Sequence, residues 1–206
     1  GGAAACADWI EVDVRRGGSG GRGVVHDEDV ERVTGDEGGV GCTSWETLRD
    51  LDVLGSGAGI PRLDDALDVI PPGVGVQIEL KELSLAADVS AALTDHDNPA
   101  ILISFSPLAL QEARAAAPDT PLGYVLHDGV YGDDPELGID TAVELGCDAV
   151  HMYYATGSDP EVVEYAHDHG LVVQTAVPEA GPTEDVLETC RAAGVDRLST
   201  DERPDG

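Results

Sequence analysis

Charged side chains alternate with apolar ones in two segments that otherwise resemble buried strands, ADWIEVDV (7–14) and QIELK (77–81). Side chains of a strand point alternately to its two faces, so Glu11 and Asp13 share one face of the first segment. By the same spacing, Glu79 and Lys81 share one face of the second. Carboxylates buried side by side repel each other, and burying them without a partner is costly. The pattern therefore predicts that a positive charge lies opposite them.

These carboxylates could meet at the carboxyl-terminal end of a parallel barrel, where polar side chains point into the mouth of the active site. Their convergence would require a cation, and ligands that are all oxygen favour Mg²⁺, Ca²⁺ or Mn²⁺ over zinc. We therefore predict a site for one divalent cation on Glu11, Asp13 and Glu79. The alternative is that each carboxylate ends its strand in water.

One lysine and one histidine extend this candidate site. Lys81 is the single lysine among 11 basic residues, and its compact ammonium suits a phosphate or a bridging carboxylate, although one lysine could also remain by chance. His26 ends an apolar run thirteen residues after Asp13, as an imidazole at the rim of a cavity would. Such a histidine is, by itself, more often structural than catalytic. His151, in AVHMYY, is a weaker candidate that could face inward.

The elements that would position these residues alternate between strand and helix, which indicates parallel βαβ units. With 7–14 in front, seven strands are expected, one fewer than in a closed (β/α)₈ barrel. An open doubly wound sheet is the alternative, but its strands should be apolar on both faces. The other six predicted strands are 73–81, 100–105, 121–127, 148–154, 171–177 and 195–200.

One glycine-rich segment gives a misleading signal. GSGGRG (18–23) fits the G-x-G-x-x-G pattern and follows a predicted strand. A dinucleotide fingerprint also needs a helix directly afterwards, and the extended run VVHD stands there instead. We therefore predict a hairpin turn.

The composition limits the class of partner and the setting. The 206 residues suffice for one core, and we expect a single domain over 1–206. With 41 acidic against 11 basic residues, the net charge of −30 disfavours nucleic acid and anionic membrane surfaces as partners. No apolar run is long enough to span a bilayer, and a cytoplasmic location is expected. The acidic, lysine-poor composition resembles that of proteins from salt-loving archaea, with an ordinary acidic protein as the alternative.

Taken in order, several segments resemble the glycerophosphodiester phosphodiesterase family over essentially the whole chain. They are ADWIEVDV, GVVHDEDVERVTGDEGGV, IPRLDDALDVI, VQIELK, ILISFSPLAL, CDAVHMYY and GVDRLSTDERPD. The resemblance implies a TIM barrel, a divalent metal on Glu11, Asp13 and Glu79, an acid–base histidine at His26 and a substrate-facing lysine at Lys81. It also implies hydrolysis of a glycerophosphodiester to glycerol 3-phosphate and an alcohol, in lipid catabolism.

The sequence departs from the family at its beginning. The family's first strand ends in His-Arg-Gly, and Pro-Glu-Asn-Thr opens its first helix; neither occurs in these 206 residues. The resemblance implies that both lie upstream of Gly1 and that GGAAACA is the tail of that helix. We therefore expect a (β/α)₈ barrel without its first strand and most of its first helix, with a gap between 7–14 and 195–200. These residues alone are then expected to show no turnover.

Two other readings remain open at this point. The first is an inactive relative of the same barrel family that keeps metal and phosphate binding. The second is another metal-dependent barrel enzyme such as an isomerase, which the spacing of His26 and the segment QIELK disfavour.

Overall fold

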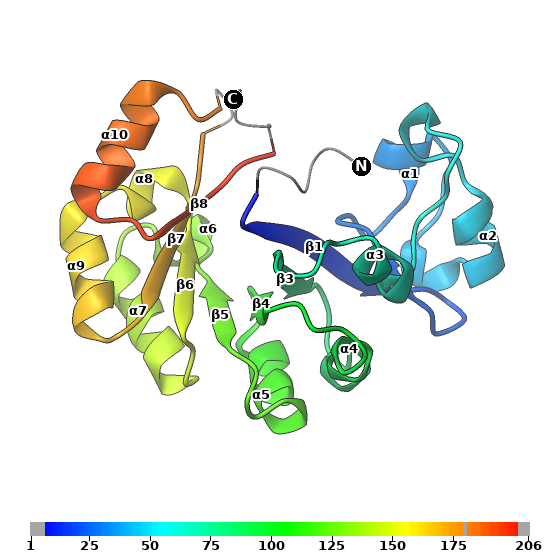
Figure 1. The fold of residues 1–206 in the computed structure, drawn as a ribbon, viewed down its shortest axis with the longest axis horizontal. Coiled ribbons are helices and arrows are strands. Elements are labelled where there is room, and N and C mark those ends of the chain that lie inside the picture. Colours follow the sequence, from blue (N-terminus) through cyan, green and yellow to red (C-terminus); the bar gives the residue numbers. More distant parts are fainter. Residues whose placement is uncertain (1–6, 179–180, 202–206) are drawn as a thin grey trace.

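The computed structural model describes residues 7–178 and 181–201, in which eight strands form one curved sheet (Figure 1). The order is β2-β1-β3-β4-β5-β6-β7-β8. β2 runs antiparallel to β1, and every other neighbouring pair is parallel. The strands are β1 (Trp9–Arg16), β2 (Arg22–Val24), β3 (Gly75–Leu80), β4 (Ala100–Ser104), β5 (Leu122–Val125), β6 (Ala149–Met152), β7 (Val172–Ala176) and β8 (Arg197–Ser199).

Helices cover the outer side of the curved sheet, and the three helices between β2 and β3 lie together beyond β1 (Figure 1). Those three are α1 (Glu31–Thr34), α2 (Trp45–Asp50) and α3 (Leu63–Asp68), with the 3₁₀ turns η1 (Val40–Cys42) and η2 (Val53–Gly55). The others are α4 (Ala86–Leu93), α5 (Pro107–Ala116), α6 (Asp128–Tyr131), α7 (Pro135–Glu144), α8 (Tyr154–Gly157), α9 (Pro160–Asp168) and α10 (Glu184–Ala193). None of these described helices is long and apolar enough to cross a membrane.

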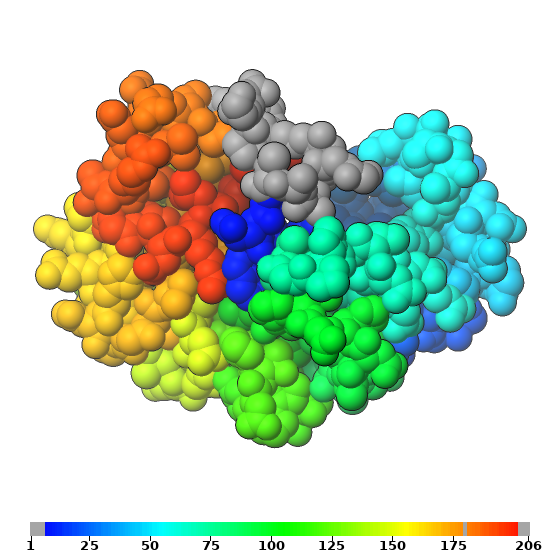
Figure 2. All heavy atoms as spheres, in the orientation of Figure 1, coloured from blue at the N-terminus to red at the C-terminus, as the bar shows by residue number. Residues whose placement is uncertain are grey.

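The arrangement confirms an α/β fold whose strands curl into part of a barrel. Seven parallel strands follow one another, and among the described residues no strand lies between β1 and β8. β2 pairs with β1 only from Val14 to Arg16, so the first half of β1 has a strand on one side only. The two edges nevertheless meet, since the Arg197 guanidinium lies 4.5 Å from the centre of the Trp9 ring. Figure 2 shows the blue start of β1 against the red segment near β8.

Local sequence signals account for the helix boundaries. The side chains of Ser106, Asp159 and Thr183 each accept a hydrogen bond from a backbone N–H in the first turn of the following helix. α10 ends at Gly194, whose φ of 87° is a left-handed conformation that glycine adopts without strain. The glycine-rich segment forms the predicted hairpin, in which Val14 lies opposite Val24.

The apolar core lies between the strands and the helices, and a smaller floor fills one end of the barrel interior. Ile101, Ile103 and Ala149 form that floor, with Trp9 packed against them. Gly75 makes room for the indole, because a Cβ there would approach the Trp9 ring to 2.3 Å.

A second apolar cluster stabilises the segment between β2 and β3. Its buried members are Val25, Val30, Val40, Trp45, Leu48 and Ile60. This cluster supports the loop that carries His26. Residues 1–6 of GGAAACA, the segment interpreted as a helix tail, lie outside the described residues, and Cys6 is among them.

Candidate active site

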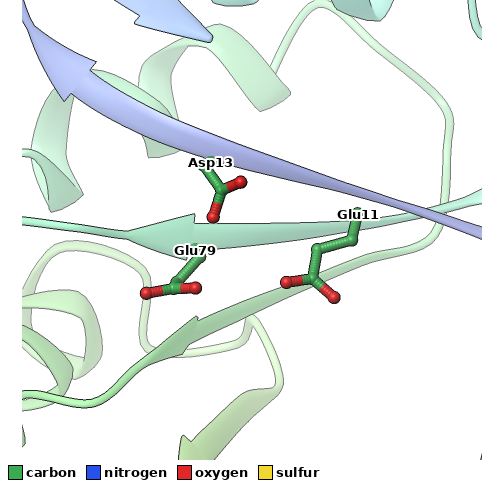
Figure 3. Close-up of side chains that lie close together, drawn as sticks. All are labelled: Glu11, Asp13 and Glu79. Carbon is green, nitrogen blue, oxygen red and sulfur yellow. The ribbon is translucent and has the colours of Figure 1, made fainter. Parts of the chain in front are cut away.

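Three carboxylates converge at the carboxyl-terminal side of β1 and β3, as the alternation predicts. One oxygen from each of Glu11, Asp13 and Glu79 lies within 4.8 Å of the other two. Figure 3 shows the three side chains extending from the two strands towards a common region. The parallel register explains the cluster, since Asp13 lies opposite Glu79 and Glu11 lies opposite Gln77.

Among the residues that the structure describes, Lys81 supplies the one positive charge in contact with this cluster. Its Nζ donates a hydrogen bond to Glu79 Oε2 at 2.7 Å and lies 3.0 Å from Asp13 Oδ1. Only 9% of the lysine side chain is exposed. Burial lowers the pKa of Lys81, but its contacts with Glu79 and Asp13 outweigh this and raise it overall, so the ammonium stays charged. One lysine against three carboxylates leaves the cluster with an excess of negative charge.

The electrostatic cost of that excess appears in the pKa values. Burial first, and then repulsion from Asp13 and Glu79, raises the pKa of Glu11 to about 7, although water still reaches this side chain at the open edge of β1. Burial also raises the pKa of Glu79. These carboxylates resist ionisation because they lie side by side. A multivalent cation bound between them would stabilise their ionised form.

The donor set fits a hard divalent cation. All three ligands would be carboxylate oxygens, which suit Mg²⁺, Ca²⁺ or Mn²⁺. Asp13 Oδ1 is buried, and the Lys81 ammonium 3.0 Å away is the positive charge that faces it.

His26 lies at the rim of a pocket next to the carboxylates, in agreement with its predicted place. The pocket has a volume of about 240 Å³, and Glu11, Asp13, His26 and Arg32 are among its lining residues. The His26 side chain is 61% exposed, and its Nδ1 lies 2.6 Å from Asp27 Oδ1. The His26 imidazole therefore lies close enough to contact a ligand in the pocket.

Asp27 is a partner of His26, and Arg32 is a partner of Asp27; the sequence alone did not single out either residue. Arg32 Nε donates to Asp27 Oδ2, and the two hydrogen bonds, from Arg32 first and His26 second, lower the pKa of Asp27 to about 2. The carboxylate stays ionised and directs Nδ1 of His26, which leaves Nε2 for a ligand. In the sequence, the only sign of this ion pair is that Asp27 and Arg32 stand five positions apart in HDEDVER.

The interior also contains a contact that sequence reasoning did not foresee. His151 faces inward as expected, and its Nδ1 lies 3.3 Å from Nε2 of Gln77, which in turn donates to Glu11. Gln77 and His151 are 74 positions apart, so only the fold reveals their contact. At the mouth, Phe105 lies beside Lys81, with Nζ 5.9 Å from the centre of its ring.

Comparison with known proteins identifies the family. The model of the glycerophosphoryl diester phosphodiesterase family matches residues 1–203, nearly the whole chain. The chain belongs to this family. Its eight mostly parallel strands, curled into part of a barrel, agree with the barrels of solved relatives.

Individual relatives of the family span most of the chain. The glycerophosphodiester phosphodiesterase of Caldanaerobacter subterraneus subsp. tengcongensis is 27% identical over 210 residues, which cover 95% of this chain and 83% of the relative. The crystal structure of the Agrobacterium tumefaciens enzyme has a TM-score of 0.79 at 27% identity, covering 95% of this chain and 85% of that one. An Oleispira antarctica phosphodiesterase, solved with the product sn-glycerol-3-phosphate, has a TM-score of 0.78 at 24% identity and shares the fold, covering 92% and 79% respectively.

Proposed function

We propose that this member of the glycerophosphoryl diester phosphodiesterase family hydrolyses glycerophosphodiesters to glycerol 3-phosphate and an alcohol at the carboxyl-terminal mouth of its barrel. The family and the names of its relatives support phosphoric diester hydrolysis as the activity. The observation that carries the proposal for the site is the convergence of three carboxylates within 4.8 Å, next to a lysine.

In this proposal Glu11, Asp13 and Glu79 hold one divalent cation, Mg²⁺ or Ca²⁺, with Mn²⁺ as a further candidate. Metal dependence is typical of the family, and the all-oxygen donor set supports a hard cation. When bound, the cation would neutralise negative charge on the phosphoryl oxygens. This charge compensation also explains how a protein with a net charge of −30 accepts an anionic substrate.

Lys81 would hold the phosphate, and His26 would transfer a proton. The buried ammonium is held in place by Glu79 and Asp13, so it is positioned for a phosphate oxygen before the substrate arrives. His26, directed by Asp27, would give a proton to the oxygen of the leaving alcohol while water supplies the new oxygen on phosphorus. The pocket that His26 lines is the place for this transfer.

A second candidate function is metal and phosphate binding without turnover. The three carboxylates and Lys81 would serve binding as well as hydrolysis.

We further propose a cytoplasmic, salt-rich setting and a role in the catabolism of lipid-derived glycerophosphodiesters. The excess of 41 acidic over 11 basic residues supports the salt-rich setting, because concentrated salt screens the repulsion among them. Residues 1–206 would belong to one phosphodiesterase domain.

Release of glycerol 3-phosphate from glycerophosphocholine tests the proposal. The assay would compare the 206-residue protein with the same protein preceded by a family first strand that carries His-Arg-Gly. We expect turnover in the longer protein, which EDTA abolishes, Mg²⁺ restores and Glu79→Gln removes. Turnover that is indifferent to EDTA and to Glu79→Gln would refute the proposed site. Cation binding without turnover in both proteins would favour the second candidate.

A further inference from the structure

The Gln77 amide connects a candidate metal ligand to a buried histidine inside the barrel. Gln77 Nε2 lies 2.8 Å from Glu11 Oε2 and 3.3 Å from His151 Nδ1. Gln77 is 2% exposed and His151 is 6% exposed. The register of β1 and β3 places Gln77 directly opposite Glu11, so their contact follows from the sheet itself.

Hydrogen-bonding chemistry fixes which groups donate. An ionised carboxylate can only accept, so the Gln77 NH₂ donates one proton to Glu11. Its second N–H faces His151 Nδ1, which therefore accepts, and the neutral ring carries its own proton on Nε2. Burial, with a smaller contribution from Arg197, lowers the pKa of His151 to about 3, which agrees with a neutral imidazole. The amide is thus held by an acceptor on each side.

Packing around His151 keeps the ring directed at Gln77. A Cβ on Gly123 would lie 2.9 Å from His151 Nε2 and 3.0 Å from a methyl of Ile103, so glycine on β5 makes the space that the imidazole occupies. Nε2 itself is buried and has no hydrogen-bond partner. The contact with Gln77 is therefore the ring's polar attachment within the barrel.

We propose that Gln77 is a positioning residue for the cation site, and that His151 acts by holding Gln77. Glu11 has a long side chain at the open edge of β1, where water reaches it. Without a partner that holds it, the side chain would have to lose its rotamer freedom when the cation binds, and this loss of entropy would weaken binding. The Gln77 hydrogen bond fixes Oε2 and leaves Oε1 for the cation. This inference rests on the proposed function, in which Glu11 is a ligand.

Mn²⁺ affinity, measured by the loss of the free-ion signal in electron paramagnetic resonance, tests the inference on the 206-residue protein. Gln77→Leu removes the amide at similar size, and we expect Mn²⁺ binding to weaken by about 10- to 100-fold. The matched control is Gln174→Leu, since Gln174 is the register partner of His151 on β7 and is similarly buried at 7% exposure. The control should keep the wild-type affinity. Melting temperatures of both variants report any general loss of stability.

A second variant decides the matter if Gln77→Leu does not fold. His151→Phe keeps a ring but removes the acceptor, and it should weaken Mn²⁺ binding in the same direction by a smaller factor. If Gln77→Leu folds, a Mn²⁺ affinity equal to that of Gln174→Leu would overturn the inference. If Gln77→Leu does not fold, a wild-type Mn²⁺ affinity of His151→Phe would overturn it. In either case wild-type binding leaves the proposed function standing. A wild-type protein that binds no Mn²⁺ at this site would overturn both.

Discussion

Protons should compete with a divalent cation for Glu11 close to neutral pH. Burial and two neighbouring carboxylates raise the pKa of Glu11 to about 7, from an ordinary value of 4.5. A ligand must be deprotonated to bind, so the apparent dissociation constant is multiplied by one plus the ratio of protonated to ionised Glu11. That factor is about 1.1 at pH 8 and about 11 at pH 6, whereas an unshifted glutamate would give about 1.0 at both. We therefore expect Mn²⁺ to bind about tenfold more weakly at pH 6 than at pH 8.

Titration of the protein with Mn²⁺ at pH 6, 7 and 8 in constant molar KCl would measure this effect, since the salt suppresses weak binding to the acidic surface. Glu79, whose pKa is also raised, would add to the change in the same direction. Glu11→Gln is the control: it should bind more weakly at pH 8 and show a smaller dependence on pH. Wild-type affinities that agree within twofold across this range would refute the reasoning about the carboxylate cluster.

Three further predictions concern the charge, the lysine and the histidine. Melting temperatures should rise from dilute to molar KCl, because 41 acidic and 11 basic residues leave strong repulsion in dilute buffer; a constant melting temperature would contradict the salt-rich setting. Lys81→Met should weaken the binding of sn-glycerol 3-phosphate in the presence of Mg²⁺, measured by calorimetry, by about tenfold or more, because a charge-assisted hydrogen bond is lost. Unchanged binding would exclude Lys81 from the phosphate site. In a form that carries the family's first strand, His26→Gln should lower turnover by about 10²- to 10⁴-fold while Mn²⁺ affinity stays unchanged; undiminished turnover would exclude His26 as the proton donor.

The sequence predicted the barrel because the relevant signals are local. Alternating side chains in β1 and β3 show which residues share a face, and caps such as Ser106 mark where helices begin. The G-x-G-x-x-G segment was correctly interpreted as a hairpin because a helix signal was absent after it. These features depend on residues a few positions apart, which is the range over which pattern and propensity act.

Contacts between distant segments could not be predicted in the same way. Alternation fixes faces but not register, and the pairing of Glu11 with Gln77 depends on how β1 and β3 align across 66 positions. The Trp9–Arg197 contact depends on the curvature that brings the two edges together. The same holds for His151, which is expected to face inward but whose partner Gln77 depends on the curvature of the sheet from β3 to β6.

Diffraction from crystals soaked in Mn²⁺ and sn-glycerol 3-phosphate would test most directly whether a cation binds between the three carboxylates beside Lys81. The anomalous signal of manganese locates the ion independently of any assumption about its ligands. We expect one strong peak within about 2.0–2.6 Å of oxygens from Glu11, Asp13 and Glu79, with a phosphate oxygen near Lys81 Nζ. A manganese peak held by other residues, with Asp13 and Glu79 still paired to Lys81 alone, would contradict the account.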